Sequence, residues 1–167
     1  MRNMTIIPLN PIYLDQASRL VNDVFGDEEE ELYPAQELWA SLDKKHLKKY
    51  QTSVDAALRS FQYYIAVEDR EVCGIIGLYE MQEDFEQQDW VGWYCVDERY
   101  RGRRIGIQLL NYVIEASKKR GKQRLCLYTS THESERKAQT LYDQNEFYVT
   151  KTVNKGSYQL LYRQKNL

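Results

Sequence analysis

The sequence has few of the side chains from which metal centres, disulfide frameworks and thiol active sites are built. Its 167 residues include three cysteines, Cys73, Cys95 and Cys126, and two histidines, His46 and His132. The cysteines are odd in number, far apart and each inside a strand-like apolar run, so we expect reduced core residues. Their spacing fits neither a metal site nor a Cys-His nucleophile, and we predict that the protein holds no metal.

A long apolar run is also missing. No segment approaches the roughly 20 apolar residues needed to span a bilayer. The N-terminal MRNMTIIPLN has neither the apolar region nor the small-residue cleavage site of a signal peptide. We therefore expect no membrane anchor and a cytoplasmic protein. The length suits a single domain over residues 1–167, which would bury about 70% of its unfolded surface.

There is no overall excess of positive charge. The formal net charge of −2 argues against general affinity for nucleic acid. The charges are unevenly spread, since residues 99–124 hold nine basic residues and one acid, whereas acids gather in residues 26–31 and 80–89. Nucleic-acid binding through the basic segment is the weakest hypothesis, because the sequence contains no recognised nucleic-acid motif.

The most informative segment runs from Trp90 to Gly121. Residues 90–96, WVGWYCV, are aromatic and β-branched, which predicts a central strand. Apolar residues then recur at helical spacing up to residue 116, and LysLysArgGly at 118–121 is typical of a helix end. We predict that the helix begins near Gly102 or Arg103, where its free main-chain N–H groups could hold a phosphate.

Residues 96–110, VDERYRGRRIGIQLL, resemble motif A of the GNAT superfamily of acetyl-CoA-dependent N-acetyltransferases, whose turn is written Q/R-x-x-G-x-G/A. Arg101 matches the first position and Gly106 the last. Arg104 stands at the middle glycine, where its side chain could hinder the approach of a pyrophosphate or add a cationic contact. The resemblance implies acetyl-CoA as co-substrate. It assigns the pantetheine arm to main-chain groups of Cys95 and Val96, and the pyrophosphate to Arg101, Gly102, Arg103, Arg104, Ile105, Gly106 and Ile107.

The rest of the chain supplies further predicted elements. Residues 4–7 and 124–130 are expected to be strands, residues 61–67 and 72–81 to form a hairpin, and residues 147–153 and 158–163 to be the closing strands. Helices are expected over residues 12–25, from Pro34 onward and over residues 133–145. These elements predict an α/β fold, a mixed sheet with helices on both faces. Their order is that of the GNAT fold.

A second signature follows the motif. Residues 138–147, AQTLYDQNEF, resemble the family pattern A-x-x-x-Y-x-x-x-G-F, with Glu146 in place of the glycine. The resemblance implies that Tyr142 lies beside the thioester sulfur and acts as general acid for the departing thiolate. A half-buried helix tyrosine with no such role is the alternative. Since a thiol has a pKa near 8.5, the loss of Tyr142 should slow the enzyme rather than silence it.

The acceptor is expected to be a primary amine, which must lose a proton before it attacks. Asp89 and Glu80, at the ends of two predicted strands, are candidate general bases, or simply solvated carboxylates. The acidic segments suggest a cationic small molecule or a basic peptide end. They also fit an ordinary solubilising surface.

The leading hypothesis is direct acetyl transfer from acetyl-CoA to the amine in a ternary complex. An acyl-CoA-responsive binding or regulatory module is the alternative, favoured by Arg104 and Glu146 and opposed by Tyr142. The sequence identifies neither the acceptor nor the length of the acyl group. It does not fix the oligomeric state, although residues 157–164, SYQLLYRQ, could pair or exchange with a neighbour in a homodimer.

Overall fold

The computed structural model describes residues 3–26 and 34–167, in which eight strands form one mixed sheet in the order β1-β2-β3-β4-β6-β8-β7, with β5 paired to β3. In chain order the elements are β1 (Thr5–Pro8), α1 (Leu14–Phe25), α2 (Pro34–Leu42), α3 (Lys44–Ser53), β2 (Leu58–Glu68), β3 (Glu71–Met81), β4 (Gln88–Val91), β5 (Cys95–Val96), α4 (Ile105–Lys119), β6 (Arg124–Ser130), α5 (Arg136–Gln144), β7 (Tyr148–Asn154) and β8 (Gln159–Asn166). The predicted mixed α/β fold is confirmed.

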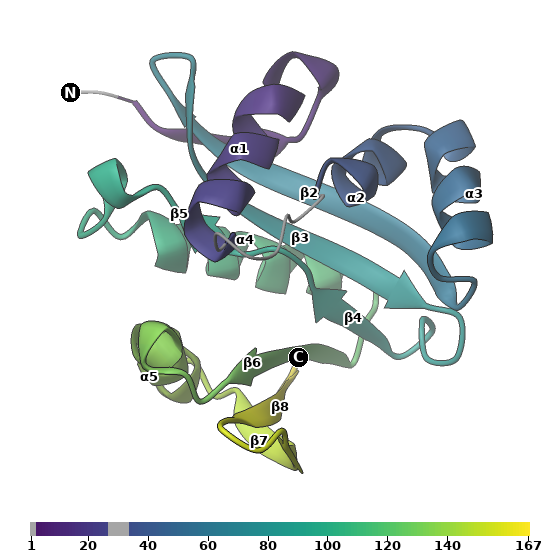
Figure 1. Cartoon of the computed structure of the whole chain (residues 1–167), viewed down its shortest axis with the longest axis vertical. Coiled ribbons are helices and arrows are strands. Elements are labelled where there is room, and N and C mark those ends of the chain that lie inside the picture. The colour runs from purple at the N-terminus through teal and green to yellow at the C-terminus, as the bar shows by residue number, and fades with distance from the viewer. Residues whose placement is uncertain (1–2, 27–33) are drawn as a thin grey trace.

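Helices cover both faces of the sheet (Figure 1). On one face, α1, α2 and α3 pack on inward-facing residues of β2 and β3, among them Tyr63 and Ile75. On the other face, α4 and α5 pack on alternate residues, including Ile76, Leu125 and Leu127. Because strand side chains alternate, Cys126 and Tyr128 of β6 face the α2 and α3 side. Within the described ranges no helix has the length and apolar character to cross a bilayer.

Most predicted elements occur close to their expected positions. Asn10 accepts a hydrogen bond from Ile12 N and caps the first helical turn, and Gly26 follows the end of α1. The β2–β3 hairpin turns through Asp69 and Arg70, which both have positive φ, as two-residue hairpin turns require. All three cysteines are buried and free.

Gly77 in β3 packs closely against an aromatic ring. A Cβ atom there would lie 2.4 Å from the ring of Tyr63 on the neighbouring strand. The absence of a side chain therefore lets the Tyr63 ring lie flat against the sheet.

The strand predicted over residues 90–96 is divided into β4 and β5. Leu78 pairs with Val91, and Ile75 pairs with Cys95. Three residues, 92–94, thus oppose two on β3, which makes a β-bulge. Gly92 N donates to Gly77 O at 2.8 Å and fixes one end of the bulge.

Three further differences concern element boundaries. The α4 helix begins at Ile105, later than predicted, because Arg104 has a left-handed backbone (φ 64°) and only then does the chain become helical. Asp43 caps α3 through His46 N, so residues 44–53 form a helix separate from α2. β8 lies between β6 and β7 and offers no free edge to a neighbouring molecule; the edge strand at this side is β7.

Candidate active site

The start of α4 presents a run of main-chain donors. Gln108 N donates to Arg104 O at 3.2 Å and forms the first bond of the helix. In the described part of the chain, no acceptor is found for the N–H groups of residues 102–107. Gly102 (φ 76°) and Arg104 (φ 64°) have left-handed backbone conformations, and the chain turns at these residues into α4. The N–H groups therefore belong to this turn and to the first residues of the helix. Such a run of N–H groups at the positive end of a helix suits a pyrophosphate.

The arginines around this turn have different surroundings. Arg103 forms a bidentate ion pair with Glu68, with N–O distances of 2.8 and 2.7 Å, so its guanidinium is directed to the sheet. Arg101 Nε donates to Val96 O at 3.2 Å. Arg104 is exposed. Among the three, Arg103 would therefore contribute main-chain atoms to an anion, whereas Arg101 and Arg104 have guanidinium groups near the surface.

The edge of β5 that faces β6 is open. β4 pairs with β6 in parallel only from Gln88 to Trp90, and β5 pairs with β3 alone. Beyond Cys126, β6 pairs only with β8. Cys95 and Val96 thus lie where two adjacent strands separate, so an extended chain could bond their main-chain groups. These are the two residues that the resemblance assigned to the pantetheine arm.

Cys95 lacks the properties of a thiol nucleophile. Its side chain is buried, and burial raises the pKa of its thiol to about 12. The thiol therefore stays protonated at neutral pH, whereas thiol nucleophiles react as thiolates.

Tyr142 lies on the α4 and α5 side of the separated strands. Its side chain is buried, and its ring centroid is 6.4 Å from that of Tyr94 in the bulge. Tyr94 in turn donates a hydrogen bond to Gly106 O at 2.6 Å. One aromatic side chain therefore connects the turn that leads into α4 with Tyr142. Burial, and then the charge of Glu135, raise the pKa of the Tyr142 phenol, so it is protonated at neutral pH and can donate.

The buried Arg163 on β8 fixes the position of α5. Its guanidinium donates to Asp143 Oδ1 and to Phe147 O, each at 2.7 Å, and to Gln139 Oε1 at 2.8 Å. These bonds attach α5, which carries Tyr142, to the sheet. They hold both the C-terminal part of the helix and the residue that begins the next segment.

Asp89 and Glu80, the candidate bases, belong to an ion-pair cluster at the opposite end of α4. Arg120 contacts both carboxylates, at 2.8 Å for Glu80 and 3.2 Å for Asp89, and Lys122 lies 2.7 Å from Glu80. Asp89 is fully buried and accepts from Ser117 at 2.7 Å. In this geometry both carboxylates are counter-ions of two cations, and their assignment as general bases stays a prediction.

The two carboxyl groups differ in pKa direction. Burial raises the pKa of Asp89 more than Ser117 and the two cations lower it. For Glu80, burial is outweighed by hydrogen bonds from Lys122 and Ser60, and its pKa is lowered. The difference follows from depth, since Asp89 has no exposed surface and Glu80 retains some.

The two charged segments are partly paired with each other. Arg120 and Lys122 of the basic segment form ion pairs with Glu80 and Asp89 of the acidic segment, and Arg99 pairs with Asp97. These ion pairs reduce the field expected from either segment. The acidic run from Asp27 to Glu31 lies outside the described residues.

A carboxylate that the sequence did not single out lies on the other face. Glu37 of α2 accepts hydrogen bonds from Tyr50 of α3 and Tyr63 of β2, each at 3.3 Å. Tyr63 lies against the bulge, since a Cβ at Gly92 would be 3.0 Å from its hydroxyl. The only sequence signal was an acid within an otherwise apolar helical stretch.

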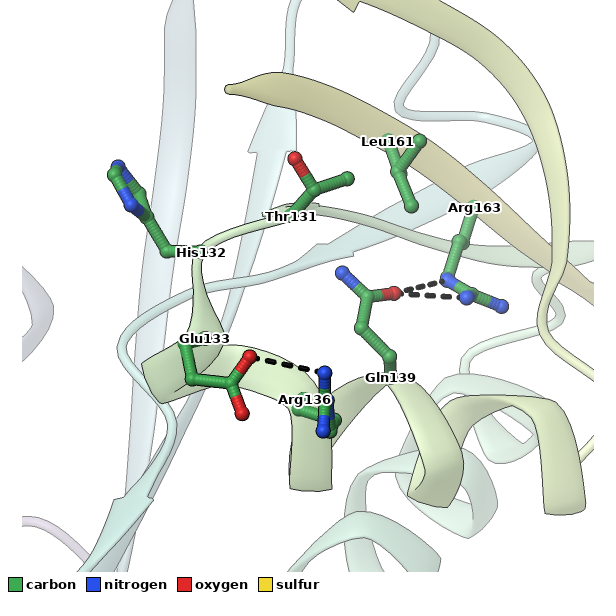
Figure 2. A pocket seen from close by; sticks show the side chains of 7 residues that line it. All are labelled: Thr131, His132, Glu133, Arg136, Gln139, Leu161 and Arg163. Atoms are coloured by element: carbon green, nitrogen blue, oxygen red, sulfur yellow. Dashed lines mark hydrogen bonds and ion pairs between the residues drawn. The ribbon is translucent and has the colours of Figure 1, made fainter. Parts of the chain in front are cut away.

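A small polar pocket lies elsewhere, between the start of α5 and β8 (Figure 2). Its volume is about 250 Å³, and its lining residues include none of those named above as binding an anion or facing the open strand edge. Figure 2 shows that Glu133 pairs with Arg136, and Gln139 with Arg163, across its floor. These side chains satisfy one another, and we assign the pocket no role. Among the described residues, no group of His, Cys, Asp and Glu could hold a metal ion.

Comparisons with known proteins agree with this geometry. The sequence model of the Acetyltransferase (GNAT) family matches residues 20–147. No curated protein sequence matches the chain at a significant level. Three solved structures illustrate the likeness of the fold. An acetyltransferase of the GNAT family from Staphylococcus aureus Mu50 has 19% identity over 99% of both chains and a TM-score of 0.69. An aminoglycoside 6'-N-acetyltransferase complexed with coenzyme A has 14% identity over 97% of this chain and 96% of that one, with a TM-score of 0.67. The ribosomal-protein-S18-alanine N-acetyltransferase from Escherichia coli has 13% identity over 98% of this chain and 94% of that one, with a TM-score of 0.71.

At such identities these structures establish the fold, while the family match covers most of the sequence. The chain therefore belongs to the acetyltransferase (GNAT) family, which uses acetyl-CoA.

Proposed function

We propose that the protein transfers an acetyl group from acetyl-CoA directly to a primary amine, with both substrates bound at once. The observation that carries this proposal is the combination of unbonded N–H groups at residues 102–107 with the open edge of β5. The first suits a pyrophosphate and the second suits an extended amide-containing arm. Two proteins of the same fold are named as N-acetyltransferases, one for an aminoglycoside and one for an alanine, which supports an amine acceptor.

In this proposal, the N–H groups of residues 102–107 bind the pyrophosphate, and main-chain groups of Cys95 and Val96 bind the pantetheine arm. The amine loses one proton to solvent and attacks the acetyl carbon as the free base. Tyr142 donates a hydrogen bond, and then a proton, to the sulfur as the carbon–sulfur bond breaks. The proton that the nitrogen sheds as the amide forms passes to solvent, from which Tyr142 is reprotonated. Its buried phenol is protonated at neutral pH, as that role requires. Direct transfer needs no enzyme nucleophile, which agrees with the high pKa of the Cys95 thiol. The rate would come chiefly from orienting the two substrates.

The test is mass-spectrometric detection of acetylated product after incubation with acetyl-CoA and a panel of polyamines, aminoglycosides, amino acids and basic peptides. We expect one class of amine to be acetylated, and Tyr142→Phe to lower kcat while thermal stabilisation by acetyl-CoA persists. Tyr148→Phe is the matched control, because Tyr148 is an exposed tyrosine on the edge strand β7.

Two results would contradict the proposal. If acetyl-CoA gave neither product nor thermal stabilisation, the co-substrate site would be refuted. If it stabilised the protein and no amine in the panel were acetylated, the regulatory module would become the better reading.

A further inference from the structure

Glu37 is a carboxylate set among aromatic side chains. Within residues 3–26 and 34–167 it forms no ion pair. Burial raises the pKa of its carboxyl group, against the lowering effect of the nearby Tyr50, Trp93 and Tyr63 side chains. A carboxylate removed from water without a counter-charge is costly, so this position needs a reason.

The hydrogen bonds that Glu37 accepts leave room for another donor. Tyr50 and Tyr63 each donate to a different carboxylate oxygen at 3.3 Å, which is long for an O–H donor. A carboxylate offers about four lone-pair directions, and these bonds use two of them. The indole N–H of Trp93 is also buried with no partner among the described residues, although it lies near enough to influence the pKa of Glu37.

Two further tyrosines lie on the same face of the sheet as Tyr63. Tyr79 of β3 packs in the same cluster as Tyr63, and Tyr128 of β6 follows Leu127, which faces the other side. Burial chiefly raises the pKa of both phenols, and the charge of Glu37 adds to it, after that of Tyr128 in the case of Tyr79. Tyr128 is 54% exposed, so the group opens to solvent on the side of β6. We call Glu37, Tyr50, Tyr63, Tyr79 and Tyr128 the tyrosine cage.

The tyrosine cage adjoins the place where the strands separate. Tyr63 lies against Gly92 in the bulge, since a Cβ atom at Gly92 would be 3.0 Å from its hydroxyl. Cys95 and the open strand edge follow within three residues of the chain. Tyr63 therefore connects Glu37 with the bulge, beside which the acetyl group would bind. Glu37 lies on the face of the sheet opposite Tyr142.

We propose that the acceptor binds in the tyrosine cage as an alkylammonium ion, with Glu37 as its counter-ion and the tyrosine rings as its walls. This inference rests on the proposed function for the identity of the site, and it adds the charge and the anchoring residue of the acceptor. An ammonium group carries three N–H donors that the unused lone pairs of Glu37 can accept. Electron-rich ring faces attract the same cation. A neutral acceptor of equal size would cover the half-buried Glu37 without supplying a counter-charge and is disfavoured.

The test is a titration of the full-length protein, saturated with CoA, with n-butylamine at neutral pH, followed through the NMR signals of the tryptophan indole N–H groups. n-Butanol serves as the neutral probe of nearly equal size. We expect butylammonium to shift the Trp93 signal at concentrations at least tenfold below those needed for butanol. In Glu37→Gln the affinity for butylammonium should fall at least tenfold.

Glu37→Gln keeps the shape of the side chain and removes the charge of a half-buried carboxylate, so it should fold as the parent does. Glu133→Gln is the matched control, because Glu133 is an exposed glutamate on the other side of the molecule's sheet, in the pocket of Figure 2. Equal binding of butylammonium by the parent and Glu37→Gln would overturn the proposal, and so would equal binding of butanol and butylamine by the parent.

Separate titrations with CoA distinguish the two levels of inference. If CoA failed to bind while butylammonium still required Glu37, the acetyltransferase site would be refuted and the cation site would stand. If CoA bound and acetylation occurred with Glu37→Gln unchanged in its KM for the amine, the cation site alone would be refuted.

Discussion

The protein should be more stable with glycine in place of Arg104 or Glu146, because each of these residues has a left-handed backbone conformation with φ 64°. A non-glycine residue in that region costs roughly 1–2 kcal/mol. Replacement by glycine relieves this strain, but it also destabilises the folded state by about 0.4–1 kcal/mol, because glycine gives the unfolded chain more conformational freedom. Neither side chain compensates strongly. Arg104 is exposed, and Glu146 pairs with Lys165 at 3.1 Å with 86% of its side chain exposed. A pair so exposed contributes little.

The expected gain is therefore about 1 kcal/mol for Arg104→Gly and for Glu146→Gly, and about 2 kcal/mol for the double variant, since the sites share no partner. This gain in the free energy of unfolding is measured by urea denaturation monitored by circular dichroism, in which the midpoint should rise while the m-value stays unchanged. Arg101→Gly is the matched control, because Arg101 has an ordinary φ of −65°. It should lose stability. If Arg104→Gly lost as much as Arg101→Gly, the argument from backbone strain would be refuted.

Three other variants test separate parts of the account. Gly77→Ala should cost about 1–3 kcal/mol, because its Cβ would lie 2.4 Å from the Tyr63 ring, and equal melting temperatures would contradict the packing argument. Asp89→Asn should cost about 1–3 kcal/mol in urea denaturation through its lost bonds, with kcat nearly unchanged; a large loss of kcat in a stable variant would support Asp89 as a general base. Arg99 holds the pKa of Asp97 below its ordinary value, so the stabilisation from Asp97 is complete above the unfolded pKa near 3.9 and is lost as the pH falls through the lower folded value. Asp97→Asn should remove that loss from the acid denaturation curve, and an unchanged curve would contradict the assignment.

The sequence predicted those features that short segments determine. The helical period after residue 104, the strand at Arg124–Ser130 and the position of Tyr142 on a following helix depend on neighbouring residues, and all were located closely. The family resemblance also marked two positions where glycine is usual. At both of them the structure keeps a left-handed backbone in spite of the larger side chain.

Features that depend on distant partners were missed. The bulge at residues 92–94 arises from the register of β4 and β5 on β3, and nothing in WVGWYCV marks it apart from its glycine. The ion pairs of Asp89 and Glu80 could not be read from the local sequence, because Arg120 and Lys122 come from a later helix end. The tyrosine cage draws one residue from each of five elements, so no local pattern announces it.

The short junction between β4 and β6 has a mechanical consequence. It is the sole run of main-chain pairing in the described residues that ties β6, β8 and β7 to the rest of the sheet. The two halves of the sheet should therefore move relative to each other about this junction, and they should separate most readily at the end near Cys95. A co-substrate that hydrogen-bonded to both halves would replace the main-chain pairing that is missing between β5 and β6. Amide hydrogen exchange along residues 127–130 should then slow when CoA is added, even where those amides make no contact with it.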